Sequence, residues 1–303
     1  MSLPTIHIPV MPEEVLEGLQ PAPGKKFIDG TFGGGGHSSL LAARVSPGGL
    51  VIGLDRDEGA VDKSQEAIDQ LAADNPDAAK CMTVYCASYH QAARALAAES
   101  LEGVDGLLLD LGLSSDQLAD RNRGFAFSVD APLDLRFDTS SGEPASQLLR
   151  RLSEQQIANV IYQFGEERFS RRIARRIVEK RQQRTPVETT TELAELVRRC
   201  VPRSKNHDID PATRTFQALR IAVNDELDIL TKALGEAANW LNPGGRIAVI
   251  SFHSLEDRIV KHAFRENGML QIITPKPLRP SERETNQNPR ARSAKLRIAE
   301  RTA

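Results

Sequence analysis

Short apolar segments alternate with helical segments through the first third of the chain, and this alternation constrains the fold more than any other feature. Strand-like segments lie at residues 26–29, 50–55, 81–85 and 106–110. Segments with helical periodicity lie at residues 38–45, 58–73 and 90–99. Such alternation predicts an α/β fold with a parallel sheet covered by helices on both faces. Because ligands of these sheets bind beyond the carboxyl ends of the strands, functional residues are expected there.

The pattern changes after Gly112, where strand-like segments disappear. Helices are predicted at residues 145–152, 154–164, 166–183 and 190–200, and a long helix from Thr213 to Leu241. Strand-like segments return at residues 246–251, 271–274 and 295–298. The sequence therefore predicts two domains. Residues 1–112 and 214–303 are expected to form one discontinuous α/β domain, and residues 113–213 an all-helical insertion.

Composition places the chain among ordinary globular proteins. Apolar residues make up 40% and charged residues 26%, which excludes intrinsic disorder. No apolar run approaches the roughly 18–20 residues of a membrane-spanning helix. Glu13, Glu14 and Glu17 fall where the apolar part of a secretory signal would lie. The three cysteines form no CxxC pair and are too few for a disulfide framework. A cytoplasmic protein is expected.

Charge is divided unevenly along the chain, although the net charge is only −2. Residues 1–110 hold 16 acidic and 7 basic side chains, a net charge of −9. Residues 111–303 hold 25 acidic and 32 basic side chains, a net charge of +7. An acidic half joined to a basic half suggests that the basic half meets a polyanion.

An arginine-rich segment at residues 168–184 concentrates much of this positive charge. On a helix, Phe169, Ile173 and Ile177 share one face. Another face holds Arg168, Arg171, Arg172, Arg175 and Arg176. Two interpretations stay open: a core-packing helix with a solvated arginine face, or a surface that binds phosphate through the guanidinium fork. A second basic segment, at residues 288–297, follows a Pro-rich stretch that predicts an extended loop.

A glycine-rich loop joins the first strand to the first helix, in the sequence Asp29-Gly-Thr-Phe-Gly-Gly-Gly-Gly-His37. Glycine suits the tight turn and lets a cofactor approach bare backbone. Asp55 ends the second strand, where a carboxylate accepts the ribose hydroxyls of a nucleoside cofactor. Loops of this kind bind NAD, FAD or S-adenosylmethionine. Asp29 before the turn and Asp110 at the end of the fourth strand favour S-adenosylmethionine.

Asp110 lies next to the expected place of a methyl acceptor. Methyl transfer to the exocyclic amine of a base needs acceptors against its N–H protons, because these stabilise the positive charge that develops. Asp110 fits this role, or it holds the adenine or the amino-acid end of the cofactor. Both roles stay open.

Residues 251–258, Ser-Phe-His-Ser-Leu-Glu-Asp-Arg, follow a later strand and so face the same edge of the sheet. Phe252 can stack on a base, and His253 can bond to the base or take a proton late in the reaction. An alternative is a helix start capped by Ser254, with Asp257 three residues on. No histidine has metal-ligand spacing to a cysteine or carboxylate, so no metal is expected.

Several long motifs together resemble one family over nearly the whole chain. They are His7-Ile-Pro-Val-Met, the glycine-rich loop, Gly53-Leu-Asp-Arg-Asp57, Leu109-Asp-Leu-Gly-Leu-Ser-Ser115, Arg123-Gly-Phe-Ala-Phe127, Leu133-Asp-Leu-Arg136, Tyr162-Gln-Phe-Gly-Glu-Glu-Arg168, Pro211-Ala-Thr-Arg-Thr-Phe-Gln-Ala218, residues 251–258 and Asn288-Pro-Arg-Ala-Arg-Ser293. The chain resembles the bacterial 16S ribosomal RNA cytosine-N4 methyltransferases, which modify cytosine 1402.

This resemblance implies a class I, Rossmann-like methyltransferase sheet of about seven strands and an inserted helical domain that recognises RNA. It implies S-adenosylmethionine as cofactor, bound by Gly35, Gly36, His37, Asp55, Tyr89, Asp110 and Gln117. The expected catalytic residues are Asp110, Phe252 and His253. The Pro-Pro-aromatic motif of many amino-group DNA methyltransferases is replaced here by Asp110-Leu-Gly-Leu113. The base-stacking ring is therefore sought among Phe252, Phe125 and Phe127.

The leading hypothesis is an RNA-binding enzyme that methylates N4 of a cytosine in 16S ribosomal RNA, on the small ribosomal subunit. No membrane or metal partner is expected, and a monomer and a homodimer are both compatible with the sequence. Three alternatives remain: a ribosome-assembly factor with a non-catalytic cofactor site, an NAD-dependent oxidoreductase, and a DNA cytosine-N4 methyltransferase. The absence of a helix-turn-helix or zinc-finger signature disfavours the last.

Overall fold

The computed structural model describes residues 9–127, 129–202 and 210–303, so His7 and Ile8 of the first motif lie outside the described residues. The chain divides into two compact units. The first comprises Met1–Ser114 and Leu227–Ala303, and the second comprises Ser115–Glu226. In the described part of the chain, no helix has the length and apolar character needed to cross a membrane.

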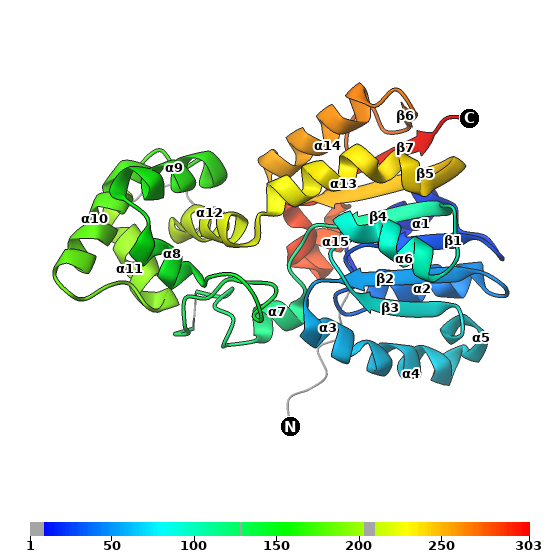
Figure 1. Cartoon of the computed structure of the whole chain (residues 1–303), viewed down its shortest axis with the longest axis horizontal. Helices are drawn as coiled ribbons and strands as arrows, with labels where there is room; N and C mark the ends of the chain where they lie inside the picture. Colours follow the sequence, from blue (N-terminus) through cyan, green and yellow to red (C-terminus); the bar gives the residue numbers. More distant parts are fainter. Residues whose placement is uncertain (1–8, 128, 203–209) are drawn as a thin grey trace. The chain divides into compact units, whose positions relative to one another are not determined.

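A seven-stranded sheet forms the centre of the first unit (Figure 1). Its strands are β1 (Lys26–Asp29), β2 (Leu50–Asp55), β3 (Met82–Cys86), β4 (Val104–Asp110), β5 (Leu241–Ser251), β6 (Leu270–Ile272) and β7 (Lys295–Arg301). Their order is β3-β2-β1-β4-β5-β7-β6, and β7 runs opposite to the other strands, antiparallel to both β5 and β6. This confirms the predicted α/β class and the class I, Rossmann-like sheet of about seven strands. The strand order reverses between β1 and β4, the place where such sheets bind ligands.

Consecutive leucines in β4 show how the sheet is buried on both faces. Leu107 and Leu109 belong to one hydrophobic cluster, while Leu108 belongs to the other. Neighbouring side chains of a strand point to opposite faces, so an uninterrupted apolar run predicts burial on both. The short apolar runs of the sequence are therefore the interior strands of the sheet.

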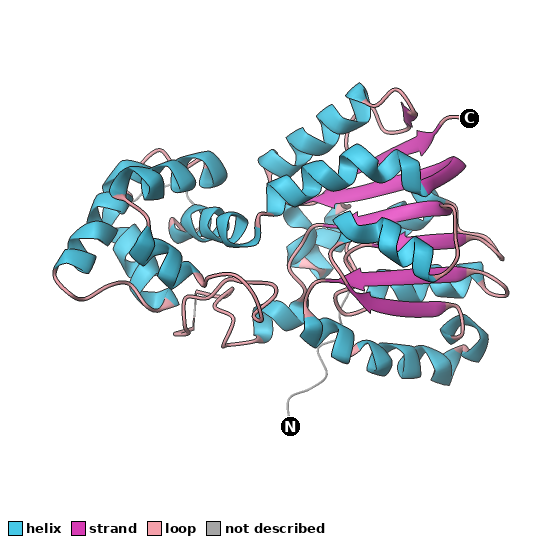
Figure 2. Cartoon of the chain, viewed as in Figure 1, coloured by secondary structure: helices cyan, strands magenta, loops and turns pink. Residues whose placement is uncertain are grey.

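Helices cover both faces of this sheet (Figure 2). One cluster takes side chains from α6 (Ala92–Ala98), α13 (Glu226–Trp240) and α14 (Ser254–Glu266). The other takes them from α1 (Pro12–Leu19), α2 (Gly36–Val45) and the short 3-10 helix η2 (Pro289–Ser293). The remaining helices of this unit are α3 (Glu58–Asp62), α4 (Ser64–Asp74), α5 (Pro76–Ala79), η1 (Tyr89–Gln91) and α15 (Glu282–Gln287).

The second unit is helical, as the sequence predicts. Its helices are α7 (Ser115–Ala119), α8 (Ala145–Arg151), α9 (Glu154–Gly165), α10 (Ser170–Gln182), α11 (Thr190–Cys200) and α12 (Ala212–Asn224). α10 buries Ile173, Ala174, Ile177 and Val178, and exposes Arg171, Arg172, Arg175 and Arg176. The predicted division of this helix into an apolar and an arginine face is thus confirmed. It begins at Ser170 rather than at residue 166, because Glu166 ends α9 in the left-handed conformation (φ 51°).

The single long helix expected from Thr213 to Leu241 is wrong. Asp225 adopts a left-handed conformation (φ 51°) and separates α12 from α13. Asn224 at the end of α12 is buried; its Nδ2 donates to the carbonyl of Leu135 and its Oδ1 accepts from the amide of Phe137, both at 2.7 Å. These bonds fasten α12 to the second unit, which ends at Glu226 and not at the residue 213 predicted from the sequence.

Candidate active site

Three carboxylates end three neighbouring strands of the first unit. Asp55 ends β2, Asp29 ends β1 and Asp110 ends β4. These strands lie side by side and parallel, so their carboxyl ends meet at one edge of the sheet. The acidic residues singled out from the sequence are therefore brought together at the point where the strand order reverses.

Asp29 organises the loop that follows it. Its side chain is only 1% exposed, and its Oδ2 accepts a 2.7 Å hydrogen bond from the Ser38 hydroxyl on α2. Its Oδ1 accepts from the amide of Thr31 at 3.2 Å. Burial raises the pKa of this carboxyl, and the nearby His37 works against that rise. Asp29 thus ties the start of the loop to the helix after it.

The glycines of this loop are required first by close packing. A Cβ added to Gly30 would lie 2.6 Å from Cδ2 of Leu109 and 2.7 Å from Cβ of Tyr89. Gly35 has φ 74° and forms the N-cap of α2, a conformation that other residues rarely adopt. Gly36 and His37 then begin the helix. The sequence explains these glycines by the close approach of a cofactor to the backbone. The structure adds a second reason, since larger side chains would clash at Gly30 or be strained at Gly35.

Asp55 holds the loop from the side of β2. Its Oδ2 accepts from the amide of Gly33 at 2.8 Å, and its Oδ1 accepts from the amide of Asp57 at 2.9 Å. Burial raises the pKa of Asp55 to about 6, against the lowering effect of these two bonds. Each carboxylate oxygen has two acceptor sites, so one remains on each for a further donor such as a ribose hydroxyl.

His37 presents a buried nitrogen that lacks a hydrogen-bond partner. Its side chain is 6% exposed, and Nε2 lies 3.6 Å from Oδ2 of Asp110. An unsatisfied buried polar atom costs free energy and therefore points to a missing ligand. S-Adenosylmethionine, with its carboxylate, amino group and ribose hydroxyls, offers the complementary groups for His37 and Asp55. The residues present therefore fit this cofactor.

Asp110 is fixed through its backbone while its side chain reaches the site. Its amide donates to the Thr31 hydroxyl at 2.7 Å, which joins the end of β4 to the glycine-rich loop. The amide of Gly112 donates to its Oδ1 at 3.4 Å, and the side chain is 14% exposed. A carboxylate in this position has acceptor capacity left for a substrate or a cofactor.

Phe252 follows β5, the strand beside β4, and lies close to Asp110 in the sheet edge. The ring approaches the backbone of Gly112 so closely that an added Cβ there would lie 2.8 Å from Cε2. The sequence predicts that Phe252 and Asp110 lie at one edge of the sheet. In the structure the Phe252 ring packs against Gly112, which follows Asp110 by two residues in the sequence. Phe252 is half-buried and so presents part of its surface.

His253 is the N-cap of α14, one residue earlier than the predicted cap at Ser254. The partner three residues on is Glu256, not Asp257, so the predicted capping pair is wrong in register. Glu256 accepts from the amide of Phe252 at 2.8 Å and from that of His253 at 3.3 Å. His253 Nε2 also lies 3.0 Å from Glu256 Oε1, without hydrogen-bond geometry. The His253 imidazole is thus engaged with its own helix.

Asp257 has a structural partner set instead of a cap. It accepts from Nε of Arg297 at 2.7 Å and from Nζ of Lys295 at 3.1 Å, both on β7. Burial acts to raise the pKa of Asp257, but these two cations outweigh it and the pKa is lowered. Two charges of the C-terminal basic segment are therefore compensated inside the first unit.

The other predicted site residues fall in different places. Tyr89 begins η1 and packs beside Gly30, at the glycine-rich loop. Gln117 lies on α7 in the second unit, and its role at the cofactor stays a prediction. Phe125 stacks on Phe137 with centroids 5.5 Å apart, and Phe127 packs on Phe216 at 4.8 Å. These last two rings are thus engaged within the second unit.

Arg290 is the residue that sequence reasoning missed. It lies in η2, is half-buried, and interacts electrostatically with Asp110. Burial lowers the pKa of this guanidinium and the charge of Asp110 acts against it. The sequence shows the basic segment, but only the return of the chain through β7 places one of its arginines near the end of β4.

Comparison with known proteins adds an independent line of evidence. A family model described as the MraW methylase family matches residues 4–302. A ribosomal RNA small subunit methyltransferase H of Rhodopirellula baltica is 54% identical, over 98% of this chain and 92% of that protein. Proteins of the same name from Synechococcus elongatus and Deinococcus radiodurans are 52% and 48% identical. They are matched over 97% and 98% of this chain, and over 94% and 90% of their own lengths.

Proposed function

Because the chain belongs to the MraW methylase family, we propose that it transfers a methyl group from S-adenosylmethionine to N4 of a cytosine, cytosine 1402, in the 16S RNA of the small ribosomal subunit. The chain is an enzyme, and S-adenosylmethionine is its methyl donor. The observation that carries the proposal is the buried, unsatisfied Nε2 of His37 beside Asp110. It lies at the edge of the sheet where the strand order reverses between β1 and β4.

The loop residues hold the cofactor in this proposal. Asp55 accepts the ribose hydroxyls on its remaining acceptor sites, and His37 donates to the carboxylate end. Gly35 and Gly36 offer backbone at the start of α2, and Tyr89 packs by the adenine. When bound, the cofactor supplies an electrophilic methyl group on a sulfonium centre. Holding the acceptor nitrogen in line with this methyl supplies much of the acceleration.

Asp110 and Phe252 act on the base. Asp110 accepts a hydrogen bond from the N4 amino group, which favours a tetrahedral nitrogen and stabilises the positive charge that develops on it. Phe252, beside Gly112, packs on the base plane. The target cytosine must leave its stack to reach this edge. The His253 Nδ1 accepts from the Glu256 amide at 3.4 Å, and its buried Nε2 forms no hydrogen bond in the described residues. In this proposal the His253 imidazole bonds to the base or takes the proton that N4 loses after methylation.

The second unit is proposed to recognise RNA. Its α10 exposes Arg171, Arg172 and Arg175 over a separate apolar face, whereas Arg176 is paired with Glu179, so phosphate contact and core packing use different sides of one helix. A cytoplasmic location follows from a ribosomal substrate.

The decisive experiment is a radiolabelled methyl-transfer assay with purified protein. The substrates are small ribosomal subunits from a strain that lacks the enzyme, naked 16S RNA, and DNA. Label on the subunit, mapped by mass spectrometry to N4 of one cytosine, is expected. Label on naked RNA alone would place the reaction earlier in subunit assembly, and label on DNA would overturn the RNA assignment.

The assembly-factor and oxidoreductase alternatives are separated by two further measurements. If Asp110→Ala abolishes label while subunit assembly in cells stays normal, catalysis is the function that this residue serves. An unchanged rate of label would remove Asp110 from the mechanism. A thermal-shift comparison is expected to show stabilisation by S-adenosylmethionine and none by NAD, since only a true ligand raises the melting temperature.

A further inference from the structure

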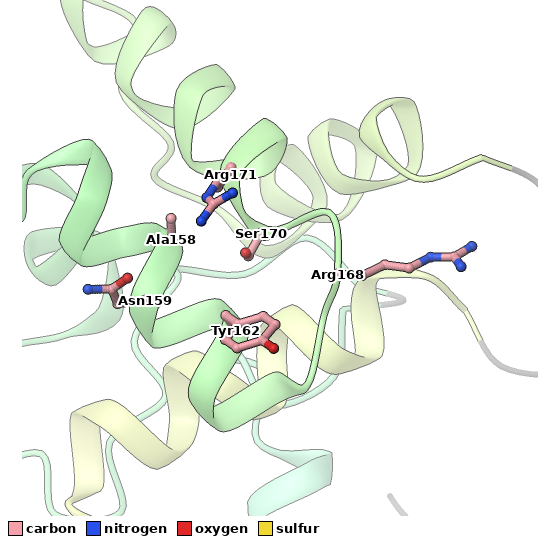
Figure 3. Close-up of a pocket in the computed structure, with 6 residues that line it drawn as sticks. All are labelled: Ala158, Asn159, Tyr162, Arg168, Ser170 and Arg171. Atoms are coloured by element: carbon pink, nitrogen blue, oxygen red, sulfur yellow. The ribbon is translucent and has the colours of Figure 1, made fainter.

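A pocket in the second unit lies between α9 and the start of α10, away from the residues assigned above (Figure 3). Its volume is about 260 Å³. It is lined by Ala158, Asn159, Tyr162, Arg168, Ser170 and Arg171. This volume is just below the roughly 300–1,000 Å³ of sites for drug-sized ligands, so the pocket suits a single flat ring with its attached polar groups.

Tyr162 gives this pocket an aromatic wall. Its side chain is 62% exposed, more than any other large apolar side chain in the part of the chain that the structure describes. On α9, Ile157, Ala158 and Ile161 are buried, and Tyr162 lies one turn after Ala158 at the edge of this apolar face, with its ring exposed. Exposed aromatic rings are the surfaces on which unpaired bases stack, at a gain that does not depend on base identity.

Arg171 and Arg168 give the pocket its charge. Ser170 lies between Tyr162 and Arg171, and Arg168 extends from the loop that leads into α10 (Figure 3). Neither arginine forms an ion pair within the described residues, whereas Arg176 on the same helix pairs with Glu179 at 2.6 Å. The Arg168 guanidinium lies 4.8 Å over the ring of Phe169, which orients it.

Electrostatics at this end of α10 favour an anion further. The first turn of α10 carries no acidic residue, and no side chain caps it. Glu167, the acidic residue nearest in sequence to Arg168, is 3% exposed and accepts from the Phe169 amide at 2.8 Å. The Glu167 carboxylate therefore binds the backbone amide of Phe169 and, in the described part of the chain, forms no ion pair with Arg168. The Arg171 guanidinium and the start of α10 therefore face the same side of the pocket, whereas the Arg168 side chain points away from Tyr162 at its rim (Figure 3).

Asn159 lies at the rim of the pocket, where its Oδ1 accepts from Gln155 at 2.8 Å. Its amide group points away from Tyr162 and Arg171 (Figure 3), so it takes no part in binding a base. The exposed Tyr162 ring and the Arg171 guanidinium beside it together complement a base and its phosphate in a single strand.

We propose that this pocket is a nucleotide subsite for single-stranded RNA, in which a base stacks on Tyr162 and its phosphate binds Arg171. The proposal rests on the proposed RNA substrate and deepens it, because it names an RNA-holding site in the second unit apart from the reacting cytosine. Base identity is not read, because stacking on a ring tolerates every base.

The test is fluorescence anisotropy of a short labelled single-stranded RNA with the full chain. Tyr162→Ala is expected to weaken binding roughly 5- to 100-fold, and Tyr162→Phe to retain it, because the ring face is preserved. Arg171→Ala is expected to weaken binding and to lower the slope of log affinity against log salt by about 0.7, the loss of one phosphate contact on a single strand. Circular dichroism melting checks that the variants fold.

Arg176→Ala is the matched control. It removes the same charge from the same helix, but from a residue outside the pocket that Glu179 already neutralises. Equal losses for Arg171→Ala and Arg176→Ala would reduce the effect to general charge and overturn the subsite. Unchanged RNA affinity in both Tyr162→Ala and Arg171→Ala would also overturn it, and would leave an acidic protein surface of the subunit as the partner of this pocket.

The methyl-transfer assay separates the failure of this proposal from that of the enzyme assignment. Tyr162→Ala is expected to raise KM for RNA with kcat and cofactor affinity unchanged, because the pocket touches neither the cofactor residues nor the proposed catalytic ones. A fall in kcat alone would contradict a binding subsite. If the wild-type protein methylates no RNA, the enzyme assignment fails, whereas the anisotropy series still decides whether the pocket binds RNA.

Discussion

At the scale of single residues, the active site consists of carboxylates whose surroundings give them different roles. Asp29 accepts hydrogen bonds from the Thr31 amide and the Ser38 hydroxyl and thereby holds the glycine-rich loop in place. Asp55 bonds two backbone amides and keeps acceptor capacity for a ligand. Asp110 is anchored by its amide, and its side chain lies 3.6 Å from Nε2 of His37 and interacts electrostatically with Arg290. Strand ends alone do not distinguish these roles; the hydrogen-bond partners do.

The raised pKa of Asp55, about 6 instead of 3.8, predicts how cofactor affinity depends on pH. In the free protein, burial disfavours the ionised form of Asp55. This lowers the free energy of unfolding above about pH 6, and the loss disappears as the pH falls toward 3.8, the pKa of the unfolded chain. Ribose hydroxyls donate to the ionised form. S-Adenosylmethionine affinity, measured by calorimetry, should therefore fall below about pH 6, by at most about tenfold per pH unit. Asp55→Asn should remove this pH dependence; an unchanged profile in that variant would assign the titration elsewhere.

The charge of Asp110 predicts a catalytic defect that differs from a binding defect. Asp110→Asn keeps the size of the side chain and removes the charge that faces the developing cation, so kcat is expected to fall by about 10²–10³. Steady-state methylation of small subunits measures this, with Asp77→Asn on the exposed surface of α5 as the control. Were only the KM for S-adenosylmethionine to rise, Asp110 would be a cofactor residue, the other role that the sequence leaves open.

At the scale of elements, the start of α14 positions Phe252. Glu256, which is 2% exposed, accepts from the amides of Phe252 and His253 and thereby fixes the turn between β5 and the helix. Glu256→Ala should lower the free energy of unfolding by about 0.5–2 kcal/mol through loss of the cap, and should slow methyl transfer because Phe252 is released.

Urea denaturation measures the first effect. Glu266→Ala at the exposed other end of α14 should change stability by no more than about 0.5 kcal/mol. Equal stability of the two variants would show that the Glu256 cap contributes nothing.

The sequence predicted the strands and most helices because each has a local signal. Short uninterrupted apolar runs mark β1, β2 and β4, which are buried on both faces, and the amphipathic face of α10 appears in the spacing of Ile173 and Ile177. The sequence did not predict the break between α12 and α13 at Asp225, because no local pattern marks it. The left-handed turn at Asp225 is stabilised by Asn224, whose hydrogen-bond partners Leu135 and Phe137 are distant in the sequence.

The candidate site was predictable only as far as strand ends determine it. Asp29, Asp55 and Asp110 could be placed together because parallel strands end on one side. Arg290 could not, because its approach to Asp110 depends on β7 running antiparallel between β5 and β6. The cap at His253 also escaped prediction, since serine at the next position is the more usual N-cap and a histidine ring nitrogen takes its place here.

At the scale of the whole molecule, the excess of basic side chains is shared between the second unit and the C-terminal part of the first unit. The second unit holds 19 basic and 17 acidic side chains, and residues 227–303 hold 13 basic and 8 acidic ones. Asp257 compensates Lys295 and Arg297, and Glu179 compensates Arg176. Under the proposed function, long-range attraction of RNA depends mainly on arginines that form no ion pair within the described residues, such as Arg171 and Arg172.

This distribution predicts that salt weakens substrate capture and leaves the chemical step unchanged. Each phosphate contact contributes about 0.7–0.9 to the slope of log affinity against log salt, whereas Asp55, His37 and Asp110 are largely buried and therefore weakly screened. Steady-state methylation over a series of KCl concentrations should show KM for RNA rising steeply while kcat stays nearly constant. The affinity for S-adenosylmethionine, a small ligand that releases no condensed counterions, serves as the internal control and should change little. A fall in kcat at constant KM would mean that salt acts on the site itself, and would contradict a division of labour between exposed arginines that hold RNA and buried carboxylates that serve the reaction.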